Sequence, residues 1–201
     1  MDEDRRHSSQ ARPFRRHGTD ELVSSRPDET ARAATRLPVI VVLDDIRSAT
    51  NVGLLFRLGD CVNIEALWLA GITAYPGVSE HATNRIAKTG VGGSLEALPW
   101  RHLPDPVPEV ARLKSDGWRV VALEQGEGST PWRQVDYGER TVLILGHERA
   151  GVGDGLLALA DAVAELPVRG ITNSLNVAMC ASAVLYELLE RARERGDPRV
   201  V

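Results

Sequence analysis

The chain has 201 residues, which is enough for one folded domain with a full core and a tail. Its hydrophobic fraction of 43% is ordinary for a globular protein, and no apolar run approaches the ~20 residues that cross a bilayer, so no membrane partner is expected. The polar N-terminus does not favour secretion, so a cytoplasmic protein is expected. Cys61 and Cys180 do not have the spacing of metal ligands, so we expect no metal site and two buried thiols.

Residues 1–36 are polar and are expected to form a mostly disordered tail, with a short helix near residues 28–35. The tail carries eight Arg and seven acidic residues, whereas the domain expected over residues 37–201 has an excess of five acidic residues. Residues 5–17 hold five Arg and two His without an acid. This cluster is either a solvated tail or a flexible arm that contacts phosphates, and the net charge of -4 does not decide between them.

Short apolar runs predict strands, and the segments between several of them have helical periodicity. The strands are expected at residues 38–43, 66–70, 118–123, 141–145 and 161–166, with a weaker one near 95–100. The helices are expected near residues 50–62, 79–89, 107–116 and 174–195. Strands that alternate with helices predict an α/β fold, with a mostly parallel sheet and helices on both faces.

A first group of functional candidates follows the strand at residues 38–43. Asn51 is a candidate N-cap of the next helix, and Gly53 inside that helix costs about 1 kcal/mol relative to alanine, which suggests a close approach there. Arg57 lies between two apolar residues in the same helix. It therefore needs an anion, and the alternative to a ligand is a structural salt bridge.

A second group follows the strand at residues 141–145. Gly146, Glu148 and Gly151 form a glycine-containing turn with a carboxylate at the edge of the sheet. The pattern alone is weakly specific, and it matches neither the dinucleotide fingerprint nor the P-loop. His147 is a candidate base, although a lone histidine in a loop is more often solvent-exposed without a role.

A third group follows the strand at residues 161–166. Pro167 ends the strand, Gly170 permits a tight turn, and Asn173 or Ser174 is expected to cap the long C-terminal helix. Capping does not account for Asn176, which is expected one turn inside the helix, where asparagine has poor propensity. We therefore expect Asn176 to hydrogen-bond a specific partner.

Taken in order, the three groups resemble the three motifs of the SpoU/TrmH branch of the SPOUT methyltransferases, over roughly residues 38–192. The first motif, N-x-G-x-x-x-R, falls on Asn51, Gly53 and Arg57. The second, L-G-x-E-x-x-G, falls on Leu145, Gly146, Glu148 and Gly151. The third, [IL]-P-x-x-G-x-x-x-S-L-N-V, falls on Leu166, Pro167, Gly170, Ser174, Leu175, Asn176 and Val177. His147 stands where Asn, Ser or Pro is commoner, and Val168 where Met is common.

The resemblance implies an S-adenosylmethionine-dependent RNA ribose 2′-O-methyltransferase that works as a homodimer, with a deep trefoil knot formed by its C-terminal segment. It implies that the cofactor is bound by loops containing Leu123, Gly146, Leu166, Val168, Gly170, Ser174 and Leu175. It also implies catalytic roles for Arg57, Asn51, Glu148, Ser174 and Asn176. We expect Arg57 to pair with an RNA phosphate and orient the ribose, because a guanidinium is a poor base.

Two other functions are weighed against this one. The first is a Rossmann-like nucleotide enzyme, which would need the dinucleotide fingerprint that this sequence lacks. The second is a non-catalytic RNA-binding or assembly protein on the same fold, which the intact motif residues disfavour. Many family members that act on ribosomal RNA carry an N-terminal substrate domain, whereas this chain has only a short Arg-bearing tail, so tRNA is slightly favoured over rRNA. No DNA partner is expected.

Overall fold

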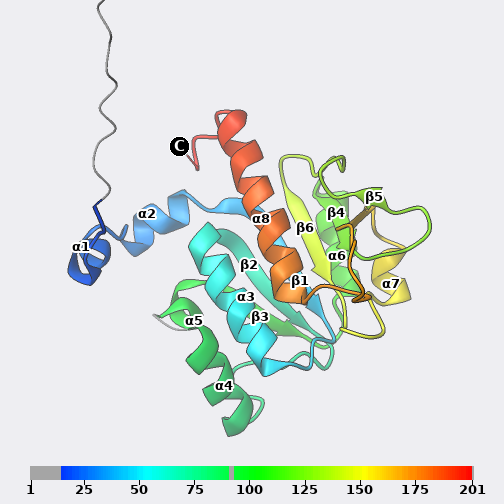
Figure 1. Cartoon of the computed structure of the whole chain (residues 1–201), viewed down its shortest axis with the longest axis horizontal. Helices are drawn as coiled ribbons and strands as arrows, with labels where there is room; N and C mark the ends of the chain where they lie inside the picture. The colour runs from blue at the N-terminus through cyan, green and yellow to red at the C-terminus, as the bar shows by residue number, and fades with distance from the viewer. Residues whose placement is uncertain (1–14, 91–92, 201) are drawn as a thin grey trace, which may run out of the picture.

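The strands of the computed structural model, which describes residues 15–90 and 93–200, form one parallel sheet (Figure 1). They are β1 (Leu37–Asp44), β2 (Ile64–Ala70), β3 (Trp100–Leu103), β4 (Arg119–Leu123), β5 (Thr130–Pro131), β6 (Thr141–Leu145) and β7 (Ala162–Glu165). Their order is β3-β2-β1-β6-β4-β7-β5, and every neighbouring pair is parallel. The predicted α/β class is therefore confirmed, and the two-residue strand β5 was not predicted.

Helices cover both faces of this sheet, as predicted. They are α1 (Thr19–Ser24), α2 (Glu29–Ala34), α3 (Ala49–Val62), α4 (Glu80–Gly90), α5 (Ser94–Ala97), α6 (Val107–Ser115), α7 (Asp154–Leu157) and α8 (Val177–Glu194). Helices α3 and α8 pack on one face, and α4 and α5 lie beside α3 (Figure 1). Helices α6 and α7 pack on the opposite face. None of the helices in the described part of the chain is long and apolar enough to span a membrane.

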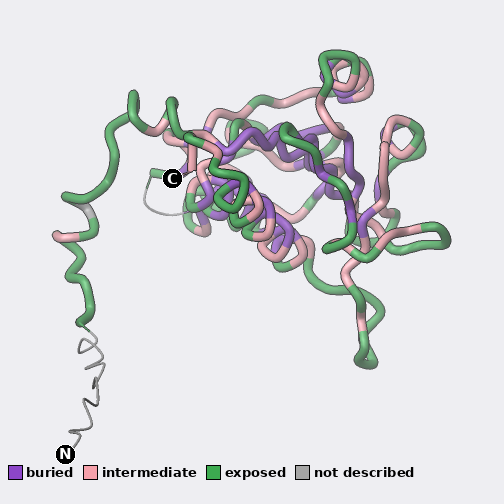
Figure 2. The backbone as a smooth tube through the Cα atoms, turned by 90° about the horizontal axis from the view of Figure 1, so that it is seen from above, coloured by how far each residue is buried: buried purple, intermediate pink, exposed green. Residues whose placement is uncertain are grey.

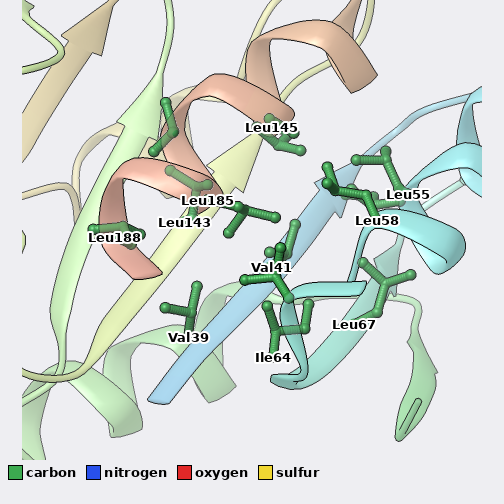
Figure 3. Close-up of a cluster of buried hydrophobic side chains, with 14 of the residues drawn as sticks. Val39, Val41, Leu55, Leu58, Ile64, Leu67, Leu143, Leu145, Leu185 and Leu188 are labelled. Carbon is green, nitrogen blue, oxygen red and sulfur yellow. The ribbon is translucent and has the colours of Figure 1, made fainter. Parts of the chain in front are cut away.

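Strand β1 is buried on both sides, which explains its unbroken apolar sequence. Val39 and Val41 point toward α3 and α8, where they pack near Leu55 and Leu185 (Figure 3). The alternate residues, such as Val42, belong to a second core under α6 and α7. The tube in Figure 2 shows this buried centre between more exposed outer segments. The sheet therefore forms a rigid support for the loops at its carboxyl edge.

The weak strand predicted near residues 95–100 exists, but it lies later in the chain than predicted. Helix α5 occupies the first part of that segment, and β3 begins only at Trp100. Leu95 and Leu98 are three residues apart, and both pack into the core. That spacing suits one turn of a helix, whereas a half-buried strand would need alternation.

The N-terminal segment contains the predicted helix near residues 28–35, which is α2, and an unpredicted helix, α1. Arg32 attaches α2 to the domain, because its guanidinium donates to Asp60 Oδ1 at 2.9 Å and to the Ala97 carbonyl at 3.1 Å. Most of the arginine cluster of residues 5–17, and residues 1–14 of the predicted disordered tail, lie outside the described residues.

The prediction of two buried thiols is wrong for Cys61, which is exposed. It follows Leu54 and Arg57 at helical spacing, so all three lie on the outer face of α3. Cys180 on α8 is half-buried, and its burial raises the pKa of the thiol. The two thiols therefore differ in their access to solvent.

Candidate functional site

A cavity of about 200 Å³ lies where the loops after β4, β6 and β7 meet the start of α8. Its lining comes from four segments that are distant in sequence: residues 123–125, residues 145–148, Ala164 with Leu166, and residues 174–177 with Cys180. In parallel α/β sheets, the carboxyl ends of the strands are where ligands bind. The predicted convergence of the second and third motif segments is thus present in the structure.

Most of the cofactor positions implied by the resemblance line this cavity. They are Leu123, Gly146, Leu166, Ser174 and Leu175. Val168 and Gly170 lie in the loop that follows Leu166 and are not part of the lining. Gly170 is exposed, and a Cβ atom added to it would meet no atom within 4 Å. Their assignment to the cofactor stays a prediction.

Asn51, Glu148 and Asn176 form a hydrogen-bonded group beside the cavity. The Asn51 amide nitrogen donates to Glu148 Oε1 at 3.0 Å, and the Asn51 amide oxygen accepts from the Asn176 amide at 3.1 Å. Asn51 is only 8% exposed, whereas Glu148 and Asn176 line the cavity. The buried amide therefore joins one residue from each of the three sequence motifs.

The helix caps differ from those predicted. Ser48 caps α3 by accepting from the Asn51 backbone amide at 3.2 Å, which leaves the Asn51 side chain free for Glu148 and Asn176. Asn176 itself caps α8, because its Oδ1 accepts from the Ala178 amide at 2.9 Å. The predicted caps Asn51, Asn173 and Ser174 are therefore wrong, and so is the placement of Asn176 inside the helix. The specific partner expected for Asn176 is confirmed.

Arg57 is not part of this hydrogen-bonded group. Its side chain is exposed on the outer face of α3 and does not line the cavity. It forms no hydrogen bond or ion pair with another described residue. The structural salt bridge weighed as the alternative to a ligand is therefore absent among the described residues, and the guanidinium faces solvent, which stabilises its charge. This leaves the guanidinium accessible to an external anion.

The loop of residues 146–152 is held in a tight turn. The backbones of His147 and Gly151 bond to each other in both directions, at 3.0 and 2.9 Å. Gly146 packs so closely that an added Cβ would lie 2.3 Å from the Gly151 carbonyl carbon. Gly151 itself has a φ of 73°, which glycine adopts without strain. Both motif glycines are thus required by the shape of the turn.

His147 has a structural role that the sequence did not indicate. Its Nδ1 accepts from the backbone amides of Arg149 and Ala150, both at 3.1 Å. An accepting Nδ1 places the proton of a neutral ring on Nε2. His147 therefore fixes the turn and lines the cavity, and it is not an idle loop histidine.

Glu124, Gln125 and Cys180 also line the cavity but were not predicted as site residues. Glu124 fastens two loops together, because one carboxylate oxygen accepts from the Val152 amide at 3.1 Å and the other from the Gln125 amide at 2.9 Å. One signal could have identified Glu124. It is a carboxylate directly after a buried strand, at the same edge as the motif residues.

The cavity has the chemistry of a site for a ligand with both apolar and polar parts. Leucines at positions 123, 145, 166 and 175 supply apolar lining, and the polar residues Glu124, Gln125, Glu148 and Asn176 line the same cavity. Gly146 lets two backbone segments approach without a side chain between them. Among the residues that the structure describes, no three His, Cys, Asp or Glu side chains gather to hold a metal. These features suit an organic ligand that has both apolar and polar parts.

Comparisons with known proteins agree with this geometry. Residues 38–186 match the SpoU rRNA Methylase family. The tRNA (guanosine(18)-2′-O)-methyltransferase of Aquifex aeolicus is 28% identical over 161 residues, which cover 79% of this chain and 72% of that protein. The crystal structure of the A. aeolicus TrmH/SpoU tRNA modifying enzyme superposes with a TM-score of 0.71 at 25% identity, covering 84% of this chain and 82% of the other. An AdoMet-bound rRNA methyltransferase from Sinorhizobium meliloti gives a TM-score of 0.66 at 27% identity, covering 80% of this chain and 60% of the other.

Proposed function

The chain belongs to the SpoU rRNA Methylase family, and from this we propose that it transfers a methyl group from S-adenosylmethionine to the 2′-hydroxyl of a ribose in RNA. The observation that carries the proposal is that the second and third motif segments line one cavity and that Asn51 of the first segment is hydrogen-bonded to both. Glu148 and Asn176 line the cavity and are joined through the Asn51 amide. A scaffold alone has no need of a buried amide that links these two residues.

The cavity residues fit the cofactor. When bound, S-adenosylmethionine supplies a methyl group on a positively charged sulfur, which an oxygen nucleophile can take. The loops of Leu123, Gly146 and Leu166 and the start of α8 would hold it, with the leucine side chains against its apolar parts. The polar parts would bond to backbone groups of the same loops, a role that we also assign to Val168 and Gly170.

We assign the orientation of the RNA to Arg57. A guanidinium can bond two oxygens of one phosphate, and it holds its own proton too tightly to be a good candidate for removing the ribose proton. Its exposed position on α3 leaves it accessible to a phosphate. The Asn51–Glu148–Asn176 group fixes the start of that helix, and Ser174 lines the cavity next to it. The reaction then depends on holding the ribose oxygen close to the methyl group.

The outer face of α3 and α8 supports the proposed homodimer. Leu54 on α3 and Met179 and Tyr186 on α8 are 38%, 60% and 48% exposed, although all three are large and apolar. Helices α3 and α8 pack against each other, so one partner surface can reach the exposed side chains of both. Covering it with a second copy would bury the apolar groups and would bring Arg57 close to the interface.

We also propose the knot that the resemblance implies. The chain leaves β7 near one end of the sheet, and α8 then packs beside α3 on the other half. Residues 166–176 must therefore cross the carboxyl ends of β4 and β6, beside the loop of residues 146–152. This path supports threading of the C-terminal segment through a neighbouring loop.

We propose tRNA as the substrate and the cytoplasm as the place of action. The support for tRNA is the A. aeolicus relative, whose name specifies a tRNA nucleotide and which this chain matches over 72% of its length. Incubation with labelled S-adenosylmethionine and separate pools of unmodified tRNA and rRNA tests the proposal. We expect label in tRNA as 2′-O-methylribose, and at least a hundredfold slower transfer by Arg57→Ala than by wild type, as when an orienting contact is lost. Label in neither RNA, or an unchanged rate for Arg57→Ala, would contradict the assignment.

A further inference from the structure

Helix α4 carries three basic side chains on one exposed face. His81, Arg85 and Lys88 are spaced four and three residues apart, so they fall within a sector of about 60° around the helix axis. All three are exposed. The buried side of the helix is formed by small and apolar residues, including Ala82 and Ile86. We refer to His81, Arg85 and Lys88 as the α4 basic face.

The charge of the α4 basic face is not balanced locally. None of its three residues forms an ion pair with another described residue, whereas Arg32, Arg112 and other arginines of the domain do. The one acid of α4, Glu80, points about 100° away from His81 around the axis. In a chain with a net charge of -4, the unpaired cations Arg85 and Lys88 attract an external anion.

The position of α4 is fixed relative to the candidate active site. Gly53 of α3 forms the contact, because a Cβ atom at that position would lie 2.7 Å from the Ile86 carbonyl oxygen and would overlap the Thr89 hydroxyl. Asn51 precedes Gly53 on α3 and Arg57 follows it by about one turn. Thr89 and Arg85 are one turn apart on α4, so the α4 basic face borders the side that meets α3.

We propose that the α4 basic face binds the phosphate backbone of the substrate RNA at nucleotides that are not methylated. The proposal rests on the proposed function, and it extends the RNA contact from Arg57 onto the neighbouring helix. His81 and Lys88 are about 10 Å apart along the helix, which is long enough for contacts with successive phosphates of one strand. Such contacts position the RNA without reading its sequence.

The test uses full-length Arg85→Gln, Lys88→Gln and the double variant. Each lost phosphate contact weakens RNA binding about threefold at moderate salt, so the double variant should have a Kd for tRNA about tenfold higher than wild type. The slope of log Kd against log salt should become shallower by about 0.7 to 0.9 per lost contact. Affinity for S-adenosylmethionine, the melting temperature and kcat at saturating tRNA should be unchanged, because α4 does not line the cavity.

Arg112→Gln is the matched control, since Arg112 is an exposed arginine on α6, across the sheet from α4. It should leave both the Kd for tRNA and the salt slope at their wild-type values. A double variant with the wild-type Kd and slope, in an enzyme that methylates tRNA, would overturn the α4 proposal alone. Wild-type protein that neither binds nor methylates RNA would overturn the proposed function as well.

Discussion

Replacement of His147 tests how the cavity loop is held in shape. In His147→Ala, the amides of Arg149 and Ala150 lose their shared acceptor, Nδ1. Asparagine at the same position can accept from amides two and three residues later, as in the turns that Asn commonly forms. We therefore expect His147→Asn to keep the shape of the loop and His147→Ala to loosen it.

The expected loss follows from two hydrogen bonds. Each contributes about 1 kcal/mol net, and water recovers part of this because Arg149 and Ala150 are exposed. A remaining cost of about 1.4 kcal/mol for ordering the loop corresponds to about tenfold weaker binding of S-adenosylmethionine by His147→Ala. His147→Asn should stay within about threefold of wild type, a difference below 1 kcal/mol.

Calorimetric titration with S-adenosylmethionine measures the affinity of wild type and of both variants. Hydrogen exchange of the Arg149 and Ala150 amides gives a second readout that needs no cofactor. Binding by His147→Asn that is as weak as binding by His147→Ala would contradict the role assigned to Nδ1.

Three further outcomes follow from the packing. Gly53→Ala should lower the free energy of unfolding by about 1–3 kcal/mol in denaturant titration, because the added Cβ overlaps a threonine hydroxyl on α4. The control is Gly126→Ala, whose added Cβ meets no atom within 4 Å, and it should change that free energy by less than about 0.5 kcal/mol. Asn176→Ala should cost about 1 kcal/mol as a lost helix cap and should also slow methyl transfer, because it releases the buried amide that it bonds. Cys61 should react with a thiol reagent faster than Cys180, because Cys61 is exposed and burial raises the pKa of the Cys180 thiol. S-adenosylmethionine should slow the reaction of Cys180 only, since Cys180 lines the cavity, and mass spectrometry of the labelled protein measures both rates.

The sequence was most informative where one physical requirement dominated. The apolar run of β1 requires burial on both faces, and the structure has cores on both sides of it. Gly53 carries a cost inside a helix that only a close neighbour explains, and α4 is that neighbour.

The sequence was least informative where several residues could perform the same task. Ser48 and Asn51 can both cap α3, and Ser174 and Asn176 can both cap α8; tertiary hydrogen bonds decide between them. The accepting role of His147 depends on the direction of two backbone amides, which no residue pattern specifies. The family resemblance named candidate site residues, but it did not supply these contacts.

Helix α3 connects the separate requirements of the proposed reaction. Its first turn presents Asn51 to the cavity residues, its outer face presents Arg57 to solvent, and its side contacts α4 at Gly53. A displacement of α3 would therefore disturb the orientation of the ribose and the RNA-binding helix together, while the leucine walls of the cavity, which come from other segments, stay in place. Gly53→Ala should accordingly raise the Kd for RNA more than the Kd for S-adenosylmethionine. Equal losses in both would indicate that the cavity is not independent of α3.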